Sequence, residues 1–154
     1  MRDLDGRALR SRPRFLPFPL PSPMTDRVVL GFDFGARRIG VAIGNSVTRD
    51  ARPLTTVNAH TVAARWDAVA ALVAEWDPAQ FVVGIPRHPD GTPHEMTARC
   101  ERYARQLEGR FRRAVARVDE RYTSAVSARA DDVDAAAAAL ILQQWFDEEG
   151  AHDA

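Results

Sequence analysis

The sequence predicts an α/β fold: a five-stranded mixed sheet, antiparallel in its first three strands and flanked by helices. Two apolar, β-branched runs within residues 28–35 and 36–44 are joined by a short Gly/Arg connection, which is the pattern of a β-hairpin. Further along, apolar runs alternate with segments whose apolar residues recur every three or four positions. An antiparallel meander followed by β-α-β crossovers gives a sheet with both strand directions.

The hairpin and the next strand form the antiparallel half of this sheet. The apolar residues of the first strand are continuous rather than alternating, so this strand should lie inside the sheet. Ala51–Val57 is expected to be the third strand, and Pro53 places its early part at an edge or a bulge. A helix is expected over Thr61–Trp76, because apolar residues recur there at helical spacing.

The crossover half completes the order of elements. It comprises a strand over Gln80–Ile85, a helix from Thr92 or Pro93 to Gly109, a strand over Ala114–Glu120, and helices over Thr123–Ala130 and Asp132–Glu149. Pro86 is expected to end the first of these strands, and Gly109 to end the first of these helices. The final helix should bury one face, made of Val133, Ala137, Leu140, Ile141, Gln144 and Trp145.

Composition indicates one ordinary globular domain in a reducing compartment. The chain has 154 residues, is 45% hydrophobic and 27% charged, and has a formal net charge of zero. Global charge therefore points to neither a nucleic acid nor a membrane. The single cysteine, Cys100, excludes an internal disulfide and fits the cytosol. No apolar stretch reaches the roughly 18–20 residues of a membrane span. A cytoplasmic protein without membrane contact is expected.

The first 23 residues differ from the rest of the chain. Alternating prolines between Phe15 and Pro23 remove backbone donors and forbid a helix. We expect residues 1–23 to be a disordered extension, or the product of a start assigned too early, with Met24 as the functional beginning. Residues 24–154 then form a single domain.

Asp33 is the one charge inside the first apolar run. A carboxylate in an inner strand loses hydration, which costs several kcal/mol unless a cation or hydrogen-bond donors compensate. A divalent metal ion is the natural compensation. The alternative is that Asp33 caps the turn at Gly35-Ala36.

Two further acidic residues could converge on Asp33. Strand alternation places Glu120 on the face of Val118, with Asp119 on the opposite face, and Asp134 lies in the first turn of the final helix. Three carboxylates without His or Cys support suit Mg²⁺ or Mn²⁺ rather than zinc. Two such ions about 4 Å apart can promote phosphodiester hydrolysis.

The same acids have an ordinary structural interpretation. Asp119 and Glu120 could pair with nearby arginines, and Asp134 could favour a helix N-terminus through the helix dipole. Spacing alone leaves the metal site and this alternative equally open.

From Val28 to about Phe146 the chain resembles the YqgF/RuvX family, a branch of the ribonuclease H-like fold related to RuvC-type Holliday junction resolvases. The resemblance lies in six motifs: Gly31-Phe32-Asp33-Phe34-Gly35 with residues 37–42, Ala51-Arg52-Pro53-Leu54, Val83-Gly84-Ile85-Pro86, Asp90-Gly91-Thr92, residues 118–124, and residues 134–137 with 140–143. It implies a metal site of Asp33, Glu120 and Asp134 that holds Mg²⁺ or Mn²⁺, as two ions.

The resemblance implies a nuclease, that is, a phosphodiester hydrolase. The expected function is metal-dependent endonucleolytic processing of the 5′ end of pre-16S rRNA in ribosome biogenesis, with structured RNA as the partner. One alternative is a Holliday junction resolvase-like nuclease acting on branched DNA. Another is a non-catalytic RNA-binding ribosome assembly factor. The chain could act as a monomer or a homodimer.

Arginines near the acids are the expected nucleic-acid contacts. Arg37 and Arg38 lie on the turn beside Asp33, and Arg121 follows Glu120. With Thr123, they are expected to position phosphate groups, which Arg binds in a planar, bidentate manner. Residues 97–121 carry eight Arg against four acidic residues, but all 21 basic residues of this chain are Arg, so a solvated helix face explains that excess equally well.

Overall fold

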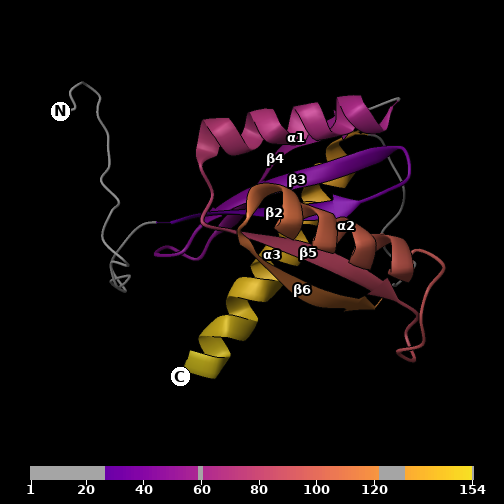
Figure 1. Ribbon diagram of the computed structural model, residues 1–154. Coiled ribbons are helices and arrows are strands. Elements are labelled where there is room, and N and C mark those ends of the chain that lie inside the picture. The colour runs from indigo at the N-terminus through magenta and orange to yellow at the C-terminus, as the bar shows by residue number, and fades with distance from the viewer. Residues whose placement is uncertain (1–26, 59–60, 122–130, 154) are drawn as a thin grey trace.

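A computed structural model describes residues 27–58, 61–121 and 131–153. It has the α/β architecture that the sequence predicts, with a central sheet and helices on both faces (Figure 1). Its strands are β2 (Val28–Phe34), β3 (Arg38–Asn45), β4 (Ala51–Asn58), β5 (Gln80–Arg87) and β6 (Ala114–Arg121). Its helices are α1 (Val62–Trp76), α2 (Thr97–Phe111) and α3 (Asp131–Asp153). The short helix expected over Thr123–Ala130 lies outside the described residues.

The sheet has the strand order β4-β3-β2-β5-β6. β2, β3 and β4 are antiparallel neighbours, whereas β5 pairs in parallel with both β2 and β6. β2 is thus an inner strand, as its continuous apolar run indicates. β4 is an edge strand, and the register of its pairing with β3 shifts between Val41 and Ala42, where Pro53 lies opposite. Both positions expected for Pro53, an edge and a bulge, are confirmed.

Two hydrophobic clusters occupy the two faces of the sheet. α1 and α2 cover one face, where Phe32 and Phe81 pack with Trp66 and Tyr103. α3 covers the other face, and Figure 1 shows it passing behind the strands. Its buried residues are Ala135, Ala138, Ile141, Leu142 and Phe146.

Glycines on the α3 face allow this helix to lie close to the sheet. A Cβ at Gly40 in β3 would overlap the backbone carbonyl of Asp134, and a Cβ at Gly84 in β5 would come within 2.5 Å of the Ile141 side chain. Protein interiors are close-packed, so either methyl group would push α3 away from the sheet. The first turn of α3 is therefore positioned by Gly40.

Two expected boundaries in the crossover half are wrong. β5 continues through Pro86 to Arg87. Beyond Val83, β5 pairs with β6 but no longer with β2, so one side of the strand has no neighbour. Proline, which lacks a backbone N–H, is tolerated at such a position. The following helix begins at Thr97 rather than at Thr92 or Pro93, because residues 88–96 form a hydrogen-bonded loop.

The C-terminal end of α2 and the buried face of α3 also differ from expectation. α2 runs past Gly109 to Phe111, and Arg112 takes the left-handed conformation that ends it. Leu140 is 66% exposed, whereas Ala135 and Ala138 are buried. The buried face of α3 contains small residues at its start and large ones further along, with Ile141 opposite Gly84 and Phe146 opposite Gly44. Apolar spacing alone pointed to a face turned from this one.

Candidate metal centre

Asp33 and Glu120 extend over the same face of the sheet. Asp33 pairs with Gly40, whose missing Cβ would point at α3, so the Asp33 side chain also leaves the sheet on the α3 side. Glu120 pairs with Pro86, two residues beyond the Val118 that packs against α3. The alternation expected for Glu120 and Asp119 is confirmed. Both acids therefore face α3 near the carboxyl ends of their strands.

Gly84 leaves open space between these two acids. β5 separates β2 from β6, so the backbones that bear Asp33 and Glu120 are about 10 Å apart at ordinary strand spacing. Glu120 Oε1 lies 3.3 Å from the position that a Cβ would occupy at Gly84. A side chain at that position would fill the space over which the two carboxyl groups approach each other.

Asp134 joins them from α3. It lies in the first turn of that helix, its carbonyl directly above Gly40, and 26% of its side chain is exposed. The sequence predicted that Asp134 points toward the sheet, and its position confirms this. Three acids that are distant in sequence thus surround the carboxyl end of β2.

The electrostatics of Asp33 show how closely the three acids are coupled. Burial, then the negative charge of Glu120, then that of Asp134, raise the pKa of the Asp33 carboxyl from 3.8 to about 7. Burial also raises the pKa of Glu120. Asp33 therefore does not compensate its charge by capping a turn, and a site of this kind favours a bound cation.

In this conformation a guanidinium supplies part of the positive charge. Arg38 Nε donates to Asp134 Oδ2 at 2.6 Å, and both side chains are partly exposed. Among the residues that the structure describes, no three His, Cys, Asp or Glu side chains form a group ready to hold a metal ion. The three acids share one place in the fold, but Asp134 is directed at Arg38.

The other expected nucleic-acid residues have different outcomes. Arg37 is exposed on the hairpin turn, and it makes no hydrogen bond or ion pair within the described part of the chain. The backbone of Arg121 ends β6, and Thr123 lies outside the described residues. Asp119 pairs with Arg87 at 2.9 Å on the opposite face, so the structural interpretation is correct for Asp119.

The lone cysteine does not supply a nucleophile. Cys100 is buried in α2, and its Sγ lies 3.9 Å from the carbonyl oxygen of Phe34. Burial, with the negative charges of Asp33 and Glu120, raises the pKa of its thiol to about 12. The thiol is therefore protonated at neutral pH.

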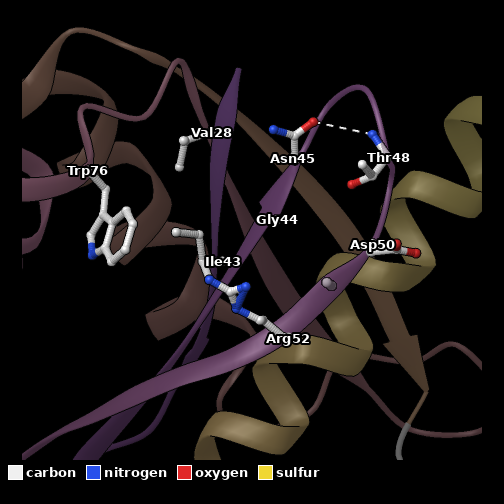
Figure 2. A pocket seen from close by; sticks show the side chains of 9 residues that line it. Val28, Ile43, Gly44, Asn45, Thr48, Asp50, Arg52 and Trp76 are labelled. Atoms are coloured by element: carbon white, nitrogen blue, oxygen red, sulfur yellow. Dashed lines mark hydrogen bonds between the residues drawn. The ribbon is translucent and has the colours of Figure 1, made fainter. Parts of the chain in front are cut away.

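A separate cavity of about 350 Å³ lies at the far end of the sheet. Figure 2 shows its walls, with Val28 and Ile43 facing Trp76 and with Asp50 and Arg52 on β4 or beside it. Val28 is five residues from Asp33, which is about 17 Å along a strand. Val28 and Ile43 also belong to the hydrophobic cluster on the α1 and α2 side. This cavity is not part of the carboxylate site.

The fold is of the RuvC kind. The T. thermophilus RuvC in complex with a Holliday junction substrate superimposes with a TM-score of 0.51 at 16% identity, over 79% of this chain and 95% of that one. That likeness shows the fold. A family model described as RuvX, Holliday junction resolvase, matches residues 27–148. The chain belongs to the RuvX family.

Relatives of known name are much closer in sequence. A protein of Paraburkholderia xenovorans is 50% identical over 130 residues, which is 79% of this chain and 89% of the relative. A protein of Burkholderia mallei is 52% identical over 131 residues, with the same shares covered. Both bear the name "Putative pre-16S rRNA nuclease".

Sequence reasoning missed the residues that position the acids. The Arg38–Asp134 pair joins residues 96 positions apart, and no local pattern indicates it. Gly40 and Gly84 carried a weak signal, because a glycine inside an apolar strand often marks the close approach of another backbone.

Proposed function

We propose that this protein is a metal-dependent endonuclease that processes the 5′ end of pre-16S rRNA in ribosome biogenesis, with Asp33, Glu120 and Asp134 as its catalytic, metal-binding residues. The observation that carries the proposal is the raised pKa of Asp33, which is due first to the burial of its carboxyl group and then to the negative charges of Glu120 and Asp134 nearby. The pre-16S rRNA nuclease name of relatives about 50% identical supports the substrate. Such an enzyme acts in the cytoplasm, where ribosomes are assembled.

The donor set fits Mg²⁺ or Mn²⁺. All three groups are carboxylates, the hard oxygen ligands that these ions prefer. Two bound ions would activate water and stabilise the leaving oxygen of a phosphodiester. Asp33 and Glu120 already face the same space, and Asp134 completes the set when its carboxylate turns from Arg38 toward them.

Arg38 lies beside Asp134, and its guanidinium is the kind of group that binds a phosphate oxygen in a bidentate manner. Arg37 is exposed on the hairpin turn. Together with Arg121 and Thr123, it positions the neighbouring phosphate groups of the nucleic acid. The chain thus holds the phosphodiester from the hairpin side while the acids hold the metal.

We further propose that residues 24–154 form a single nuclease domain. The family match begins at residue 27 and ends at 148, and the described strands and helices lie within 28–153. In this proposal, residues 1–23 lie outside the domain.

A second candidate function is cleavage of branched DNA. The description of the matching family and the likeness of the fold to RuvC favour it. A junction resolvase uses the same metal chemistry but acts as a dimer with two active sites, whereas RNA processing is possible for a monomer or a homodimer. A non-catalytic RNA-binding assembly factor would keep the fold without cleavage.

Parallel incubation with two substrates separates these functions. Labelled pre-16S rRNA and a four-way DNA junction are each incubated with the protein, with and without Mn²⁺. We expect metal-dependent cleavage of the RNA and little cleavage of the junction. Preferential cleavage of the junction would establish the second candidate, and binding of RNA without cleavage would establish the assembly factor.

A further inference from the structure

The cavity at the amino end of β2 is bordered by side chains from one face of the sheet. Val28 in β2 pairs with Asn45 in β3, and Ile43 in β3 pairs with Arg52 in β4, so these four side chains leave the sheet on the same side. Val28 and Ile43 belong to the hydrophobic cluster beneath α1 and α2, and Trp76, the last residue of α1, packs against that cluster. Three strands and one helix thus border a space of about 350 Å³.

The two ends of this cavity differ in chemistry. Figure 2 shows the indole of Trp76 beside Ile43, and the guanidinium of Arg52 extending from β4 toward this apolar end. Thr48 and Asp50 lie at the opposite end, where β3 turns into β4. A ligand in the cavity would therefore meet an aromatic ring and a positive charge at one end, and a hydroxyl and a carboxylate at the other.

The turn after β3 fixes the orientation of the Asn45 amide. Its Oδ1 accepts from the backbone N–H of Val47 at 2.7 Å and from that of Thr48 at 3.2 Å. With its oxygen held in this way, the amide directs its Nδ2 toward Val28 and the cavity, as Figure 2 shows. Within the described residues Nδ2 has no acceptor, so it offers hydrogen-bond donors to a ligand.

The charged groups at the cavity have no partner in the described part of the chain. Arg52 and Asp50 form no ion pair or side-chain hydrogen bond there, although they are only two residues apart. By contrast, three arginines on or beside β5 and β6 pair with acids: Arg87 with Asp119, Arg113 with Asp77, and Arg117 with Glu101. The charge of Arg52 is thus available to an anionic group of a ligand.

This set of groups defines the class of ligand. An indole stacks on planar rings, a guanidinium binds phosphate oxygens, and an amide N–H donates to a carbonyl oxygen or a ring nitrogen. The carboxylate of Asp50 accepts from hydroxyl groups and repels an anion, so the anionic group of the ligand must lie toward Arg52. The volume is at the lower end of ligand pockets, which span about 300–1,000 Å³. A single nucleotide combines a planar ring, hydroxyl groups and a phosphate at this size.

We propose that this cavity binds a single nucleotide, with its base against Trp76, its phosphate at Arg52, and hydrogen bonds from its base or ribose to Asn45 and Asp50. The cavity lies on the face of the sheet opposite to the carboxylates and about 17 Å from Asp33 along β2. The inference therefore goes beyond the proposed function and does not depend on it. It also gives a role to the sequence motif of residues 51–54, which the proposed nuclease chemistry does not use. The nucleotide is either free or part of an RNA strand, and the test separates these two sources.

Two substitutions remove the proposed contacts and keep the walls of the cavity. Arg52→Gln removes a charge from an exposed position of an edge strand. Asn45→Asp retains an oxygen for the N–H groups of Val47 and Thr48 but replaces the amide donor with an acceptor. Arg105→Gln is the matched control, because it removes the same charge from an exposed position of α2 that does not line the cavity.

The test titrates the four ribonucleoside 5′-monophosphates, and separately a short single-stranded RNA, into the protein in EDTA. The indole ¹⁵N resonances of the tryptophans report binding: that of Trp76 should shift saturably, whereas those of Trp66 and Trp145, which do not line the cavity, should not. Arg52→Gln should weaken binding about tenfold, the effect of losing one hydrogen bond to a charged group. Asn45→Asp should weaken it by a similar factor, because it removes a donor and adds a negative charge. Arg105→Gln should bind within twofold of wild type.

The outcomes decide both the site and the source of the nucleotide. A shift with the monophosphates identifies a site for free nucleotides, and a shift with the RNA alone identifies a site for a nucleotide within a strand. An unchanged Trp76 resonance in wild-type protein with every probe at millimolar concentration would overturn the proposal, whether or not the variants fold. Equal binding by Arg52→Gln and wild type, or equal weakening by Arg52→Gln and Arg105→Gln, would also overturn it. No metal is present in this test, so failure of the site would leave the proposed nuclease activity untouched.

Discussion

At the scale of single residues, Asp33 governs how this protein responds to pH when no metal is bound. Its pKa in the folded protein is about 7, against 3.8 in the absence of the fold. The folded state therefore holds the proton up to a higher pH than the unfolded state does. The contribution of Asp33 to stability is complete below about pH 4 and is lost as the pH rises to 7 and above.

Asp33→Asn should remove this loss, because the amide has no proton to release. In EDTA, we expect the variant to be more stable than wild type at pH 8 and about as stable at pH 4. Urea unfolding at the two pH values measures the difference. A difference in the free energy of unfolding between variant and wild type that is the same at pH 4 and pH 8 would contradict the assigned pKa.

The two hairpin arginines should contribute unequally to nucleic-acid binding. Arg37→Ala should flatten the slope of log affinity against log salt by about one unit, because Arg37 has no partner in the described chain. Arg38→Ala should flatten it by less, since the charge of Arg38 is partly balanced by Asp134. Salt titrations of RNA binding without divalent metal compare them, and an unchanged slope for Arg37→Ala would remove the turn from the interface.

At this scale, the sequence predicted those features that depend only on local strand geometry. Alternation along β6 placed Glu120 and Asp119 on opposite faces, and a lone charge in a continuous apolar run identified Asp33. The pairing of Arg38 with Asp134 could not be predicted, because it depends on where α3 lies over β3.

At the scale of elements, the central relation is the close packing of α3 on β3 at Gly40. Gly40→Ala should displace the first turn of α3, because the new methyl group would overlap the Asp134 carbonyl. We expect a loss of about 1–3 kcal/mol of stability, measured by urea unfolding, and a weaker response of activity to added metal. Gly109→Ala is the control: nothing lies within 4 Å of its Cβ, so stability should be equal or higher by up to about 1 kcal/mol. Equal effects of the two substitutions would refute this role for Gly40.

The elements themselves were largely predictable, and the errors have one cause. All five strands and the helix over residues 61–76 follow from apolar runs and periodicity, with Thr61 capping that helix through its hydroxyl. The errors arose where tertiary contacts set the boundary or the buried face. The end of the β2–β5 pairing allows β5 to continue through Pro86, and the hydrogen bond of Thr97 to Pro86 fixes the start of α2. The glycines opposite α3 determine which of its faces is buried, and Leu140 is not on that face.

At the scale of the whole molecule, we expect residues 1–23 to contribute little to the stability of the domain. A chain that begins at Met24 should melt within about 2 °C of the full-length protein, because the first 23 residues have no apolar periodicity with which to join the core. Thermal unfolding of the two forms checks this. A drop of more than about 5 °C, which is more than a kcal/mol at this size, would show that the N-terminal segment packs on the domain.

Among the helices that the structure describes, none is both long and apolar enough to cross a membrane. The mixed sheet, with helices on both faces, places Asp33 and Glu120 on the α3 side, and Asp134 lies in the first turn of that helix. We propose that Asp33, Glu120 and Asp134 act as one metal-binding unit.

The decisive measurement is metal-dependent cleavage of pre-16S rRNA by Asp33→Asn, Glu120→Gln and Asp134→Asn, in protein purified free of host nucleases. Each substitution keeps size but removes a charge, so cleavage should fall about a hundredfold or more. The double variant Asp33→Asn/Glu120→Gln should lose little more than either single one, since groups that act as a unit are not additive. Asp119→Asn, on the opposite face beside Arg87, should cleave nearly as wild type does. Cleavage by Asp33→Asn at the wild-type rate would contradict the account.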